Sequence, residues 1–460
     1  MRRSVQKWTI FMTRRRMVNA RQQIVGMVIF IIGVFILNAI LQTKSLRNTS
    51  QVPDGSNYVN GQHHVTELTF ESFPDVPTNC VKRVHIFGNL TDMAIWPELS
   101  SWYNLFKRGQ FFKHTADVFC PLYNCTLRFT IGTNLTHLKG KDAVIFGALP
   151  KAFEGRLHDM ISKDPEPTQT WFYYSTETPL RVVHWNRDVR VADLRYHKMM
   201  TYRSDSDIHI PFGYYQKRLK PLTDYEFNER YGRNKTKLIA WMASNCAQIF
   251  WPRIPIVEQL SRRLPLDTYG RCGKLSCLPQ RSEMCKLMLQ QYKFYMTLAN
   301  SECHEYITEK FWDQTISQGI VPVVYGAPKS DFQKIGPPNS FIHLSDFSSL
   351  KELAGHLKRL DTDHESYMKY LEWIRDYEVV STFPIQITHL CRIIPHLYNG
   401  TAPELHRLGD STWYEGCRNL PNEDIFTPFW PREQMLAYFT WTPWGSERDG
   451  MNKGTNIKPF

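Results

Sequence analysis

A short run in the second half of the chain combines a tyrosine, an acid and a base with the signals that open a helix. The run is Tyr306-Ile-Thr-Glu309-Lys310-Phe-Trp, in which Thr308 is a typical N-cap, and Gly319 is a typical helix end. The helix dipole disfavours a lysine in the first turn, whereas the N–H groups at a helix start attract anions. We therefore predict an anion site here, with Lys310 binding the phosphates of a nucleotide diphosphate. The alternative is an ordinary exposed lysine.

A second candidate for chemistry is a carboxylate that follows a run of aromatic residues. Glu177 comes after Trp171-Phe-Tyr-Tyr-Ser-Thr and before Thr178-Pro179. A buried strand of this composition delivers Glu177 to the carboxyl edge of a parallel sheet, where open α/β folds bind ligands. In that place the carboxylate can act as a general base. The alternative is a carboxylate that only caps the turn before the proline.

Three other side chains are candidates for contacts with the same ligand. Arg271 follows a predicted strand and a glycine turn, from where its guanidinium can hold a phosphate through two N–H groups. Glu309 is expected to contact sugar hydroxyls, or else to be an ordinary first-turn acid. Tyr306 is expected to stack on the ligand or to hydrogen-bond to it, or else to pack in the core.

Short apolar runs predict the strands that position these residues. The runs are nearly continuous and alternate with helical stretches, which favours parallel sheets covered on both faces. They cover residues 84–88, 143–146, 170–175, 238–243, 267–270, 294–298, 320–325 and 341–344. One set precedes residue 216 and the other follows it, with a polar joint at residues 217–234. The sequence therefore predicts an α/β protein with two Rossmann-like domains that face each other across a cleft.

The beginning of the chain differs in composition from these domains. Residues 1–23 contain seven basic and no acidic side chains, and residues 24–41 are apolar apart from Asn38. This combination predicts a cytosolic tail and a transmembrane signal anchor, with the rest of the chain lumenal; a cleaved signal peptide is the alternative. Residues 42–78 are expected to form a flexible stem. The expected domains are an N-terminal Rossmann-like domain (79–215), a C-terminal one that binds the nucleotide (216–380) and an extension that packs on the body (381–460).

The charge of the chain argues against a nucleic-acid partner. The formal net charge is +12, but seven of the basic residues lie in the predicted tail. The remaining chain has no dense basic stripe with interleaved aromatic residues. Its modest positive charge instead suits a phosphorylated sugar donor.

The cysteines and the glycosylation sequons favour the secretory pathway. All ten cysteines follow the predicted anchor, and an even number in an oxidising lumen predicts disulfides. A zinc site at Cys272, Cys277 and Cys285 is disfavoured because the spacing is wrong and no histidine pair completes it. We expect N-glycosylation on the lumenal side. The sequons lie at Asn48, Asn89, Asn124, Asn134, Asn234 and Asn399.

Several blocks in the second half resemble the α1,3-fucosyltransferases, enzymes that use GDP-fucose. The blocks begin Tyr306-Ile-Thr-Glu-Lys, Val321-Pro-Val-Val-Tyr-Gly, Ser340-Phe-Ile-His and Leu350-Lys-Glu-Leu-Ala. Weaker similarity extends back to about residue 170. The resemblance implies a GT-B architecture and an inverting transfer of fucose to the 3-hydroxyl of a GlcNAc or glucose unit of a glycan, on glycoproteins. It also implies a single-pass type II protein of the Golgi membrane with a lumenal catalytic part.

The resemblance assigns roles to particular residues of this sequence. Glu177 matches the glutamate of the family's Glu-Ser-Pro motif and would be the general base, although Thr178 replaces the serine. Lys310, together with Arg271 or Arg253, would stabilise the GDP leaving group, and such electrostatic stabilisation often contributes most to catalysis. Donor-site residues would therefore come from several separate parts of the chain.

The remaining donor-site assignments include one departure from the family. The segment Ser-Asn245-Cys resembles a strand end that approaches the nucleotide, and Arg253 is the arginine that follows it. Asn300 is expected to reach the donor, or else only to end a strand. The family's usual Phe-Glu-Asn is replaced here by Leu-Ala299-Asn300, so a carboxylate that normally sits beside the donor is missing. Donor affinity or catalytic efficiency is therefore in question.

Other functions stay open at this level. Asp205-Ser-Asp207 is a DxD pair that could hold Mn²⁺ or Mg²⁺ under a nucleotide diphosphate in a metal-dependent transferase. In the family the same segment is a signature of the first domain, and it implies no bound metal. A further alternative follows from the missing glutamate at position 299. The protein could bind glycans in the lumen without catalysing any transfer.

The expected ligands and the open questions follow from these interpretations. No tightly bound cofactor is expected; GDP-fucose would be the co-substrate, and a divalent cation could be stimulatory. The acceptor glycan is undetermined between core N-glycans, Lewis-type antennae and LacdiNAc structures. Disulfide pairing is also open, because Ile394 replaces the second cysteine of a Cys391-Arg-x-Cys element.

Overall fold

The structure is a computed structural model of the chain. It describes residues 80–109, 111–149, 153, 155–232, 235–247, 249–278, 282–398, 404–418, 431–439 and 441–444. The chain divides into two units, Met1–Val59 and Asn60–Phe460, and every described residue belongs to the second. The predicted tail, anchor and stem, and the sequons at Asn48, Asn234 and Asn399, lie outside the described residues. Within these ranges no helix is long and apolar enough to cross a membrane.

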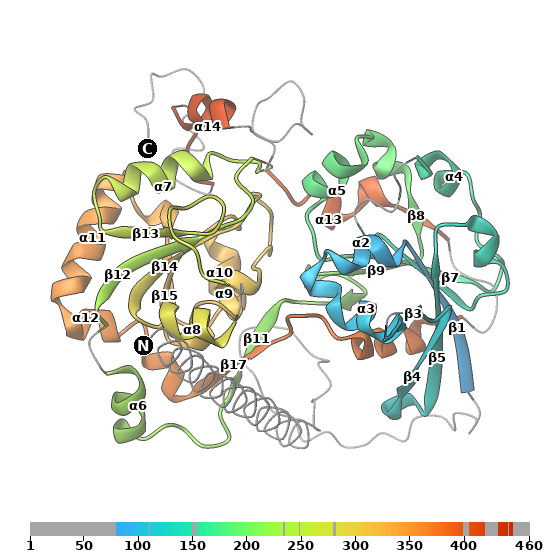
Figure 1. The fold of residues 1–460 in the computed structure, drawn as a ribbon, viewed down its shortest axis with the longest axis horizontal. Helices are drawn as coiled ribbons and strands as arrows, with labels where there is room; N and C mark the ends of the chain where they lie inside the picture. Colours follow the sequence, from blue (N-terminus) through green and yellow to red (C-terminus); the bar gives the residue numbers. More distant parts are fainter. Residues whose placement is uncertain are drawn as a thin grey trace, which may run out of the picture. The chain divides into compact units, whose positions relative to one another are not determined.

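The first part of the described chain, which we call the N-lobe, is built on a sheet of seven described strands in the order β10-β9-β7-β6-β1-β5-β4 (Figure 1). All neighbours are parallel except β4 and β5. Strands β6 and β7 are buried at every position, as expected for a sheet covered on both faces. The strands are β1 (Cys80–Phe87), β4 (Thr115–Cys120), β5 (Cys125–Gly132), β6 (Ala143–Phe146), β7 (Thr170–Ser175), β9 (Lys198–Thr201) and β10 (Ile208–His209). The helices include α2 (Leu90–Ala94), α3 (Ser100–Phe106), α4 (Leu157–Ile161) and α5 (Pro179–Asn186).

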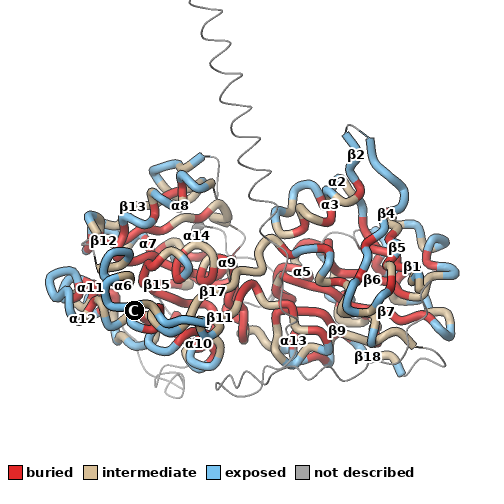
Figure 2. Tube along the Cα trace, turned by 90° about the horizontal axis from the view of Figure 1, so that it is seen from below, coloured by how far each residue is buried: buried red, intermediate tan, exposed pale blue. Residues whose placement is uncertain are grey.

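The second part, the C-lobe, contains a wholly parallel sheet of five described strands in the order β13-β12-β14-β15-β16. Its strands are β12 (Lys237–Met242), β13 (Leu266–Tyr269), β14 (Tyr292–Leu298), β15 (Val321–Tyr325) and β16 (Ile342–His343). Its helices include α7 (Arg253–Ser261), α8 (Glu283–Leu289), α9 (Glu309–Trp312), α10 (Lys329–Ile335), α11 (Leu350–Thr362) and α12 (His364–Met368). Buried residues follow the strands of both sheets (Figure 2). The predicted α/β class is confirmed, and both sheets are parallel apart from the edge strand β4 of the N-lobe.

The chain passes between the lobes on two paired strands. Strand β11 (Gly213–Lys217) leads from the N-lobe and pairs antiparallel with β17 (Tyr377–Ser381), on which the chain returns. A Cβ at Gly213 would lie 2.6 Å from Cγ of Trp312, so only glycine lets β11 pass this close to α9. The segment predicted as a polar joint also contains a helix, α6 (Asp224–Tyr231), which a capping box at Thr223 and Glu226 begins. The division into domains at residues 215 and 380 stays a prediction.

The C-terminal part of the described chain contacts both lobes. Strand β18 (His406–Arg407) pairs with β8 (Arg195–Tyr196) of the N-lobe. Helix α14 (Pro431–Tyr438) lies against α7 of the C-lobe, where the Gln434 side chain accepts a hydrogen bond from the Ile254 N–H and donates one to the Cys246 carbonyl. The segment therefore links elements that lie far apart in sequence.

All ten cysteines lie in the described ranges and pair with one another, which confirms the predicted disulfides. The pairs are Cys80–Cys125, Cys120–Cys391, Cys246–Cys272, Cys277–Cys285 and Cys303–Cys417. Cys391, whose partner the sequence left open, bonds to a residue of β4 that is 271 positions away.

Candidate functional site

A cavity of about 370 Å³ collects residues from both lobes. Its wall includes all eight residues that the sequence proposed for catalysis and donor binding. They are Glu177, Asn245, Arg253, Arg271, Asn300, Tyr306, Glu309 and Lys310. The parallel strands explain this convergence, because the segments that follow β7, β12, β13 and β14 leave the sheets at their carboxyl edges.

Glu177 follows β7, and hydrogen bonds fix its backbone. Its N–H donates to Ser175 Oγ at 3.2 Å, and its carbonyl accepts from Trp413 Nε1 at 3.2 Å. The N-cap of α5 is Thr178, whose side chain accepts from the Arg181 N–H. The proposed alternative, in which Glu177 only caps this turn, therefore does not apply. Its carboxylate is instead part of the cavity wall.

Tyr306 connects the C-lobe to this carboxylate. Its hydroxyl donates a hydrogen bond of 3.1 Å to Glu177 Oε2, while its ring packs against Tyr202 and Phe212. Burial, with the charge of Glu177 as the next cause, raises the pKa of Tyr306 well above its usual value. The phenol is therefore protonated at neutral pH and able to donate. Tyr306 therefore packs in the core and also bonds to Glu177, whereas its predicted contact with the ligand stays a prediction.

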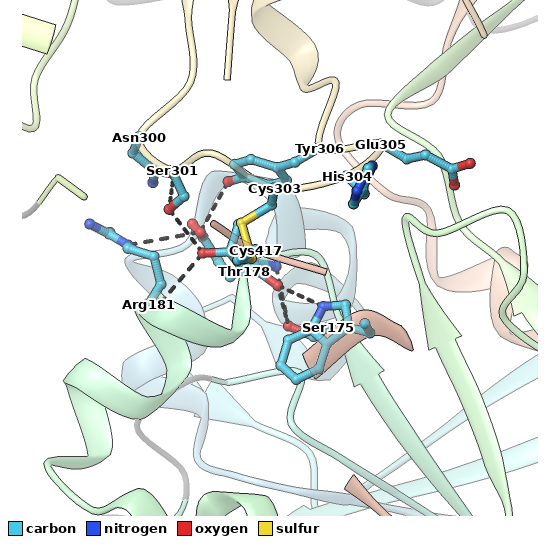
Figure 3. The surroundings of a disulfide bond; sticks show 12 residues. Ser175, Thr178, Arg181, Asn300, Ser301, Cys303, His304, Glu305, Tyr306 and Cys417 are labelled. Carbon is cyan, nitrogen blue, oxygen red and sulfur yellow. Dashed lines mark hydrogen bonds and ion pairs between the residues drawn. A yellow bond between two sulfur atoms is a disulfide. The ribbon is translucent and has the colours of Figure 1, made fainter. Parts of the chain in front are cut away.

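A second contact between the lobes lies beside the first. Thr178 Oγ1 and Ser301 Oγ are 3.1 Å apart and share a hydrogen bond. Figure 3 shows Ser301 and Tyr306, from the loop after β14, next to Thr178 and Arg181 of α5. Cys303 of the same loop forms the disulfide with Cys417. The loop is thus held from both sides.

Lys310 lines the cavity, but the predicted helix around it is wrong. The α-helix covers only Glu309–Trp312; a separate 3-10 helix (Ile316–Gln318) precedes Gly319, which is left-handed as expected. Thr315 Oγ1 donates to the carbonyls of Lys310 and Phe311, and such local side-chain bonds compete with a continuing helix. A helix this short carries little of the dipole that the prediction invoked. Lys310 Nζ instead lies 2.8 Å from Glu309 Oε1, so the adjacent acid balances its charge.

Arg253 is buried in the cavity wall, where it hydrogen-bonds to two backbone segments. Its guanidinium donates to the carbonyls of Leu298, at 3.0 Å, and Asn245, at 2.6 Å. These carbonyls lie at the end of β14 and in the loop after β12. Burial, with the charge of Arg181 as the next cause, lowers the pKa of Arg253 to about 10, so the side chain stays cationic at neutral pH. Arg253 therefore holds two segments of the C-lobe together and also places a positive charge in the wall.

Arg271 and Asn300 lie on separate loops of the C-lobe, after β13 and β14. Arg271 is exposed and follows Gly270, whose φ of 82° is the left-handed conformation that the glycine turn predicted. The adjacent Cys272 is disulfide-bonded to Cys246, which fixes this loop to the one after β12. Asn300 follows β14, and its Oδ1 accepts from Ser301 Oγ at 3.2 Å.

The alanine at position 299 lies outside the cavity wall. Ala299 is buried and is not one of the residues that line the cavity. A Cβ placed on Gly326 would come within 2.5 Å of the Ala299 Cβ, so this side chain packs against the end of β15. The effect of this replacement on donor affinity stays a prediction.

Sequence reasoning missed Arg181, a cation beside Glu177. Arg181 Nε is 3.8 Å from Glu177 Oε2, and its guanidinium lies 4.0 Å from the ring centre of Trp185. The side chain is almost fully buried. The signal was an acid and a base four positions apart at a Thr-Pro helix start, a spacing at which helical side chains meet. The sequence also did not point to the cavity residues Trp96, Glu98, Phe212, Gln314 and Phe383.

The metal-binding alternative at the DxD pair finds no support. Asp205 is paired with Arg203 at 2.8 Å, and Asp207 is paired with Lys198 at 2.9 Å and accepts from the Met199 N–H. Neither aspartate lines the cavity. The described ranges also contain no group of three His, Cys, Asp or Glu side chains that could hold a metal ion. These residues therefore give no reason to expect the stimulatory cation.

Three predicted glycosylation sites lie in the described ranges. Asn89, Asn124 and Asn134 are all exposed, which an N-linked glycan requires. Asn89 caps α2, Asn134 caps a 3-10 helix, and Asn124 has a left-handed backbone. Modification at these sites stays a prediction.

Comparison with known proteins agrees with the division into two lobes. The family model "Fucosyltransferase, N-terminal" matches residues 95–213, and "Glycosyltransferase family 10 (fucosyltransferase) C-term" matches residues 232–407. Glycoprotein 3-alpha-L-fucosyltransferase A of Drosophila melanogaster is 33% identical over 70% of this chain and 59% of its own length. A 4-galactosyl-N-acetylglucosaminide 3-alpha-L-fucosyltransferase of Pan troglodytes is 37% identical over 45% of this chain and 54% of its own.

The chain thus spans somewhat more than half the length of these curated relatives. A solved alpha1,3-fucosyltransferase with GDP-fucose is 14% identical, with a TM-score of 0.40, over 71% of this chain and 93% of that one. The two family models together match more than half of the chain, one in each lobe. The N-terminal match begins at residue 95, further back than the similarity to about residue 170 that the sequence indicated. The chain therefore belongs to glycosyltransferase family 10, the fucosyltransferases.

Proposed function

We propose that the protein is an inverting α1,3-fucosyltransferase that moves L-fucose from GDP-β-L-fucose to the 3-hydroxyl of a GlcNAc or glucose unit of a glycan. One observation carries the proposal: the cavity wall holds the Glu177 carboxylate from the N-lobe together with Lys310, Arg253 and Arg271 from the C-lobe. This reaction requires a general base for the acceptor hydroxyl and cations that stabilise the leaving diphosphate.

In the proposed reaction Glu177 takes the proton of the acceptor hydroxyl while that oxygen forms a bond to C1 of fucose. The bond between C1 and the β-phosphate oxygen breaks, and GDP leaves with the electron pair. Lys310 and Arg271 stabilise the charge that develops on the diphosphate, and the buried Arg253 adds a fixed positive charge. The Tyr306 hydroxyl orients the base through its hydrogen bond to Glu177.

The other cavity residues contribute to donor binding in this proposal. Glu309, held by Lys310, accepts hydrogen bonds from hydroxyls of fucose or ribose. Asn245 and Asn300 lie on the loops after β12 and β14 and supply amide groups to the nucleotide. Acceptors on glycoproteins are part of the proposal, in line with the name of the Drosophila melanogaster relative.

We also infer a place in the Golgi membrane, as a type II protein anchored through residues 24–41. The apolar run and the basic tail before it support this orientation. The five disulfides and the exposed sequons support a catalytic part in an oxidising lumen. Protease protection of the full-length protein in microsomes tests this orientation. We expect the catalytic part to be protected, and its digestion in intact vesicles would show that it faces the cytosol.

The test of the activity uses the full-length protein with GDP-fucose and two acceptor probes, N-acetyllactosamine and a glycopeptide that carries a core N-glycan. Glu177→Gln should lower kcat by about 10²–10⁴-fold, the usual contribution of a general base. Lys310→Met should raise the KM for GDP-fucose by about tenfold or more, because a charge-assisted contact is lost. The matched controls are Glu258→Gln and Lys351→Met, which alter exposed residues outside the cavity wall.

Two results would refute the proposal. Native transfer by Glu177→Gln would show that another group takes the proton. Binding of GDP without product from either acceptor would favour a glycan-binding protein without turnover.

A further inference from the structure

The residue before Tyr306 is a glutamate whose backbone has an unusual conformation. Glu305 has a φ of 58°, in the left-handed region that side chains other than asparagine and aspartate seldom adopt. Asp331 of α10 holds this turn, because its Oδ2 accepts the Glu305 N–H at 2.7 Å and lies 3.1 Å from His304 Nδ1. Glu305 lies outside the cavity wall. An unfavourable backbone conformation that the surroundings maintain is frequent at functional sites.

The carboxylate of Glu305 reaches across to the N-lobe. Its Oε2 accepts the Ser204 N–H at 2.6 Å, and its Oε1 accepts from Ser204 Oγ at 2.8 Å. Lys334 of α10 adds an ion pair, with its Nζ 2.8 Å from Glu305 Oε1, and also donates to Ser204 Oγ at 3.1 Å. Burial favours the neutral acid, but the lysine and the two serine donors outweigh it and lower the pKa of Glu305 below its usual value. The carboxylate is therefore ionised at neutral pH and joins the two lobes.

Ser204 belongs to the segment that the sequence singled out as a possible metal site. It lies between β9 and β10, directly before Asp205. Asp205 is paired with Arg203, and Asp207 accepts the Met199 N–H at 2.8 Å. The two aspartates thus hold the turn that presents Ser204. In this structure the DxD pair shapes a contact between the lobes.

The residue beside Glu305 makes a parallel contact with the same N-lobe turn. The ring of Tyr306 packs on that of Tyr202, with 5.0 Å between the centroids. The two neighbouring side chains then diverge. The Tyr306 hydroxyl donates to the proposed base, whereas Figure 3 shows the Glu305 side chain pointing away from Thr178. Because the two residues are adjacent in the chain, a shift of Glu305 also moves the phenol that bonds to the base.

We propose that Glu305 is a positioning residue for the transfer, which fixes the Tyr306 hydroxyl on the Glu177 carboxylate by attaching its loop to Ser204. The contacts of the Glu305 carboxylate set the backbone from which the tyrosine side chain extends. This assignment rests on the proposed fucosyl transfer, in which Glu177 is the base. It adds a polar contact between the lobes to the two described above, and it gives the segment around the DxD pair a role in the reaction.

Steady-state kinetics of the full-length protein tests this role, with GDP-fucose and whichever of the two acceptor probes the native protein uses. Glu305→Ala should lower kcat by about tenfold, as the loss of one hydrogen bond to a charged acceptor does. The KM for GDP-fucose should change by less than about twofold, because Glu305 lies outside the cavity wall. Glu305→Gln, which can still accept from Ser204, should retain most of the rate. Ser204→Ala and Lys334→Met should give smaller losses, and they keep the test valid if Glu305→Ala does not fold.

The decisive comparison uses the Tyr306→Phe background. There Glu305→Ala should change kcat by less than about twofold, because its effect passes through the hydroxyl that is already missing. A residue that only stabilised the fold would lower kcat by the same factor in both backgrounds. Lys329→Met is the control for Lys334→Met and should leave kcat unchanged, since Lys329 lies on the same helix and pairs with Asp346 of its own lobe.

Crystallography of the full-length Glu305→Ala variant gives a readout that does not depend on turnover. The distance from the Tyr306 hydroxyl to the Glu177 carboxylate should exceed about 3.5 Å. An unchanged hydrogen bond, a native kcat, equal losses in both backgrounds or a raised KM for GDP-fucose would each overturn the inference. If the bond is lost but the native protein transfers no fucose, the positioning role stands and the proposed activity fails.

Discussion

The hydroxyl of Tyr306 donates a hydrogen bond of 3.1 Å to the carboxylate of Glu177, and this bond joins the two lobes at the cavity. Tyr306 comes from the loop after β14, and Glu177 from the end of β7. The hydrogen bond between Thr178 and Ser301 lies beside it. The orientation of the proposed base is therefore set partly by residues of the C-lobe.

Tyr306→Phe tests this relationship. The substitution keeps the ring that packs on Tyr202 and Phe212 and removes only the hydrogen bond. A hydrogen bond to a charged acceptor contributes about 1.5–3 kcal/mol, so kcat should fall by about tenfold to a hundredfold. Steady-state kinetics measures the change, with the exposed Tyr225→Phe as control. A native kcat would show that the hydroxyl plays no part in orienting the base.

Arg181 is expected to hold Glu177 in place. Arg181→Met keeps a long apolar side chain but removes the cation beside the carboxylate. We expect kcat to fall by about tenfold, with a smaller effect on the KM for GDP-fucose. Arg181→Lys should restore part of the rate, because lysine supplies the charge but not the planar group that stacks on Trp185. Arg187→Met, at the exposed end of the same helix, is the control; equal losses in all three variants would contradict this role.

The buried His343 should make the fold sensitive to acid. Burial lowers its pKa from the usual 6.5 to about 4. Between these pH values the unfolded chain binds a proton that the folded protein does not, so this group reduces the free energy of unfolding by about 1.4 kcal/mol per pH unit as the pH falls. Between pH 6.5 and pH 4.5 the melting temperature of His343→Gln should therefore fall less than that of the native protein. Thermal unfolding at several pH values measures this, and equal losses would contradict it.

The C-terminal segment should stabilise the donor loop through Trp441. Trp441 is buried, packs on Trp251 and Tyr325, and donates to Glu302 Oε1 at 3.1 Å. Trp441→Ala should lower the free energy of unfolding by about 3–5 kcal/mol, as large-to-small core changes do. It should also raise the KM for GDP-fucose, because Glu302 belongs to the loop that carries Asn300. The exposed Phe439→Ala is the control, and a lower melting temperature with an unchanged KM would limit Trp441 to a structural role.

Several of the strands that position the site could be predicted from the sequence. The ranges predicted for β6 and β7 agree with the structure at both ends. Apolar runs between helical stretches are local patterns, and parallel strands place their carboxyl ends at a common edge. For this reason Glu177, Asn245, Arg271 and Asn300 could be assigned to neighbouring places before any contact between them was known.

Other features depend on contacts between distant residues, and the tertiary structure alone decided them. The helix around Lys310 stops early because Thr315 binds its carbonyls, although the local signals favoured a longer one. The bond between Cys120 and Cys391 and the hydrogen bonds of Ser101 to the backbone of residues 385 and 387 join positions almost 300 residues apart. No local pattern encodes such pairings, because they arise only when the two lobes and the returning C-terminal segment pack together. The sequence by itself thus determined which residues could do the chemistry, and packing decided which of them touch.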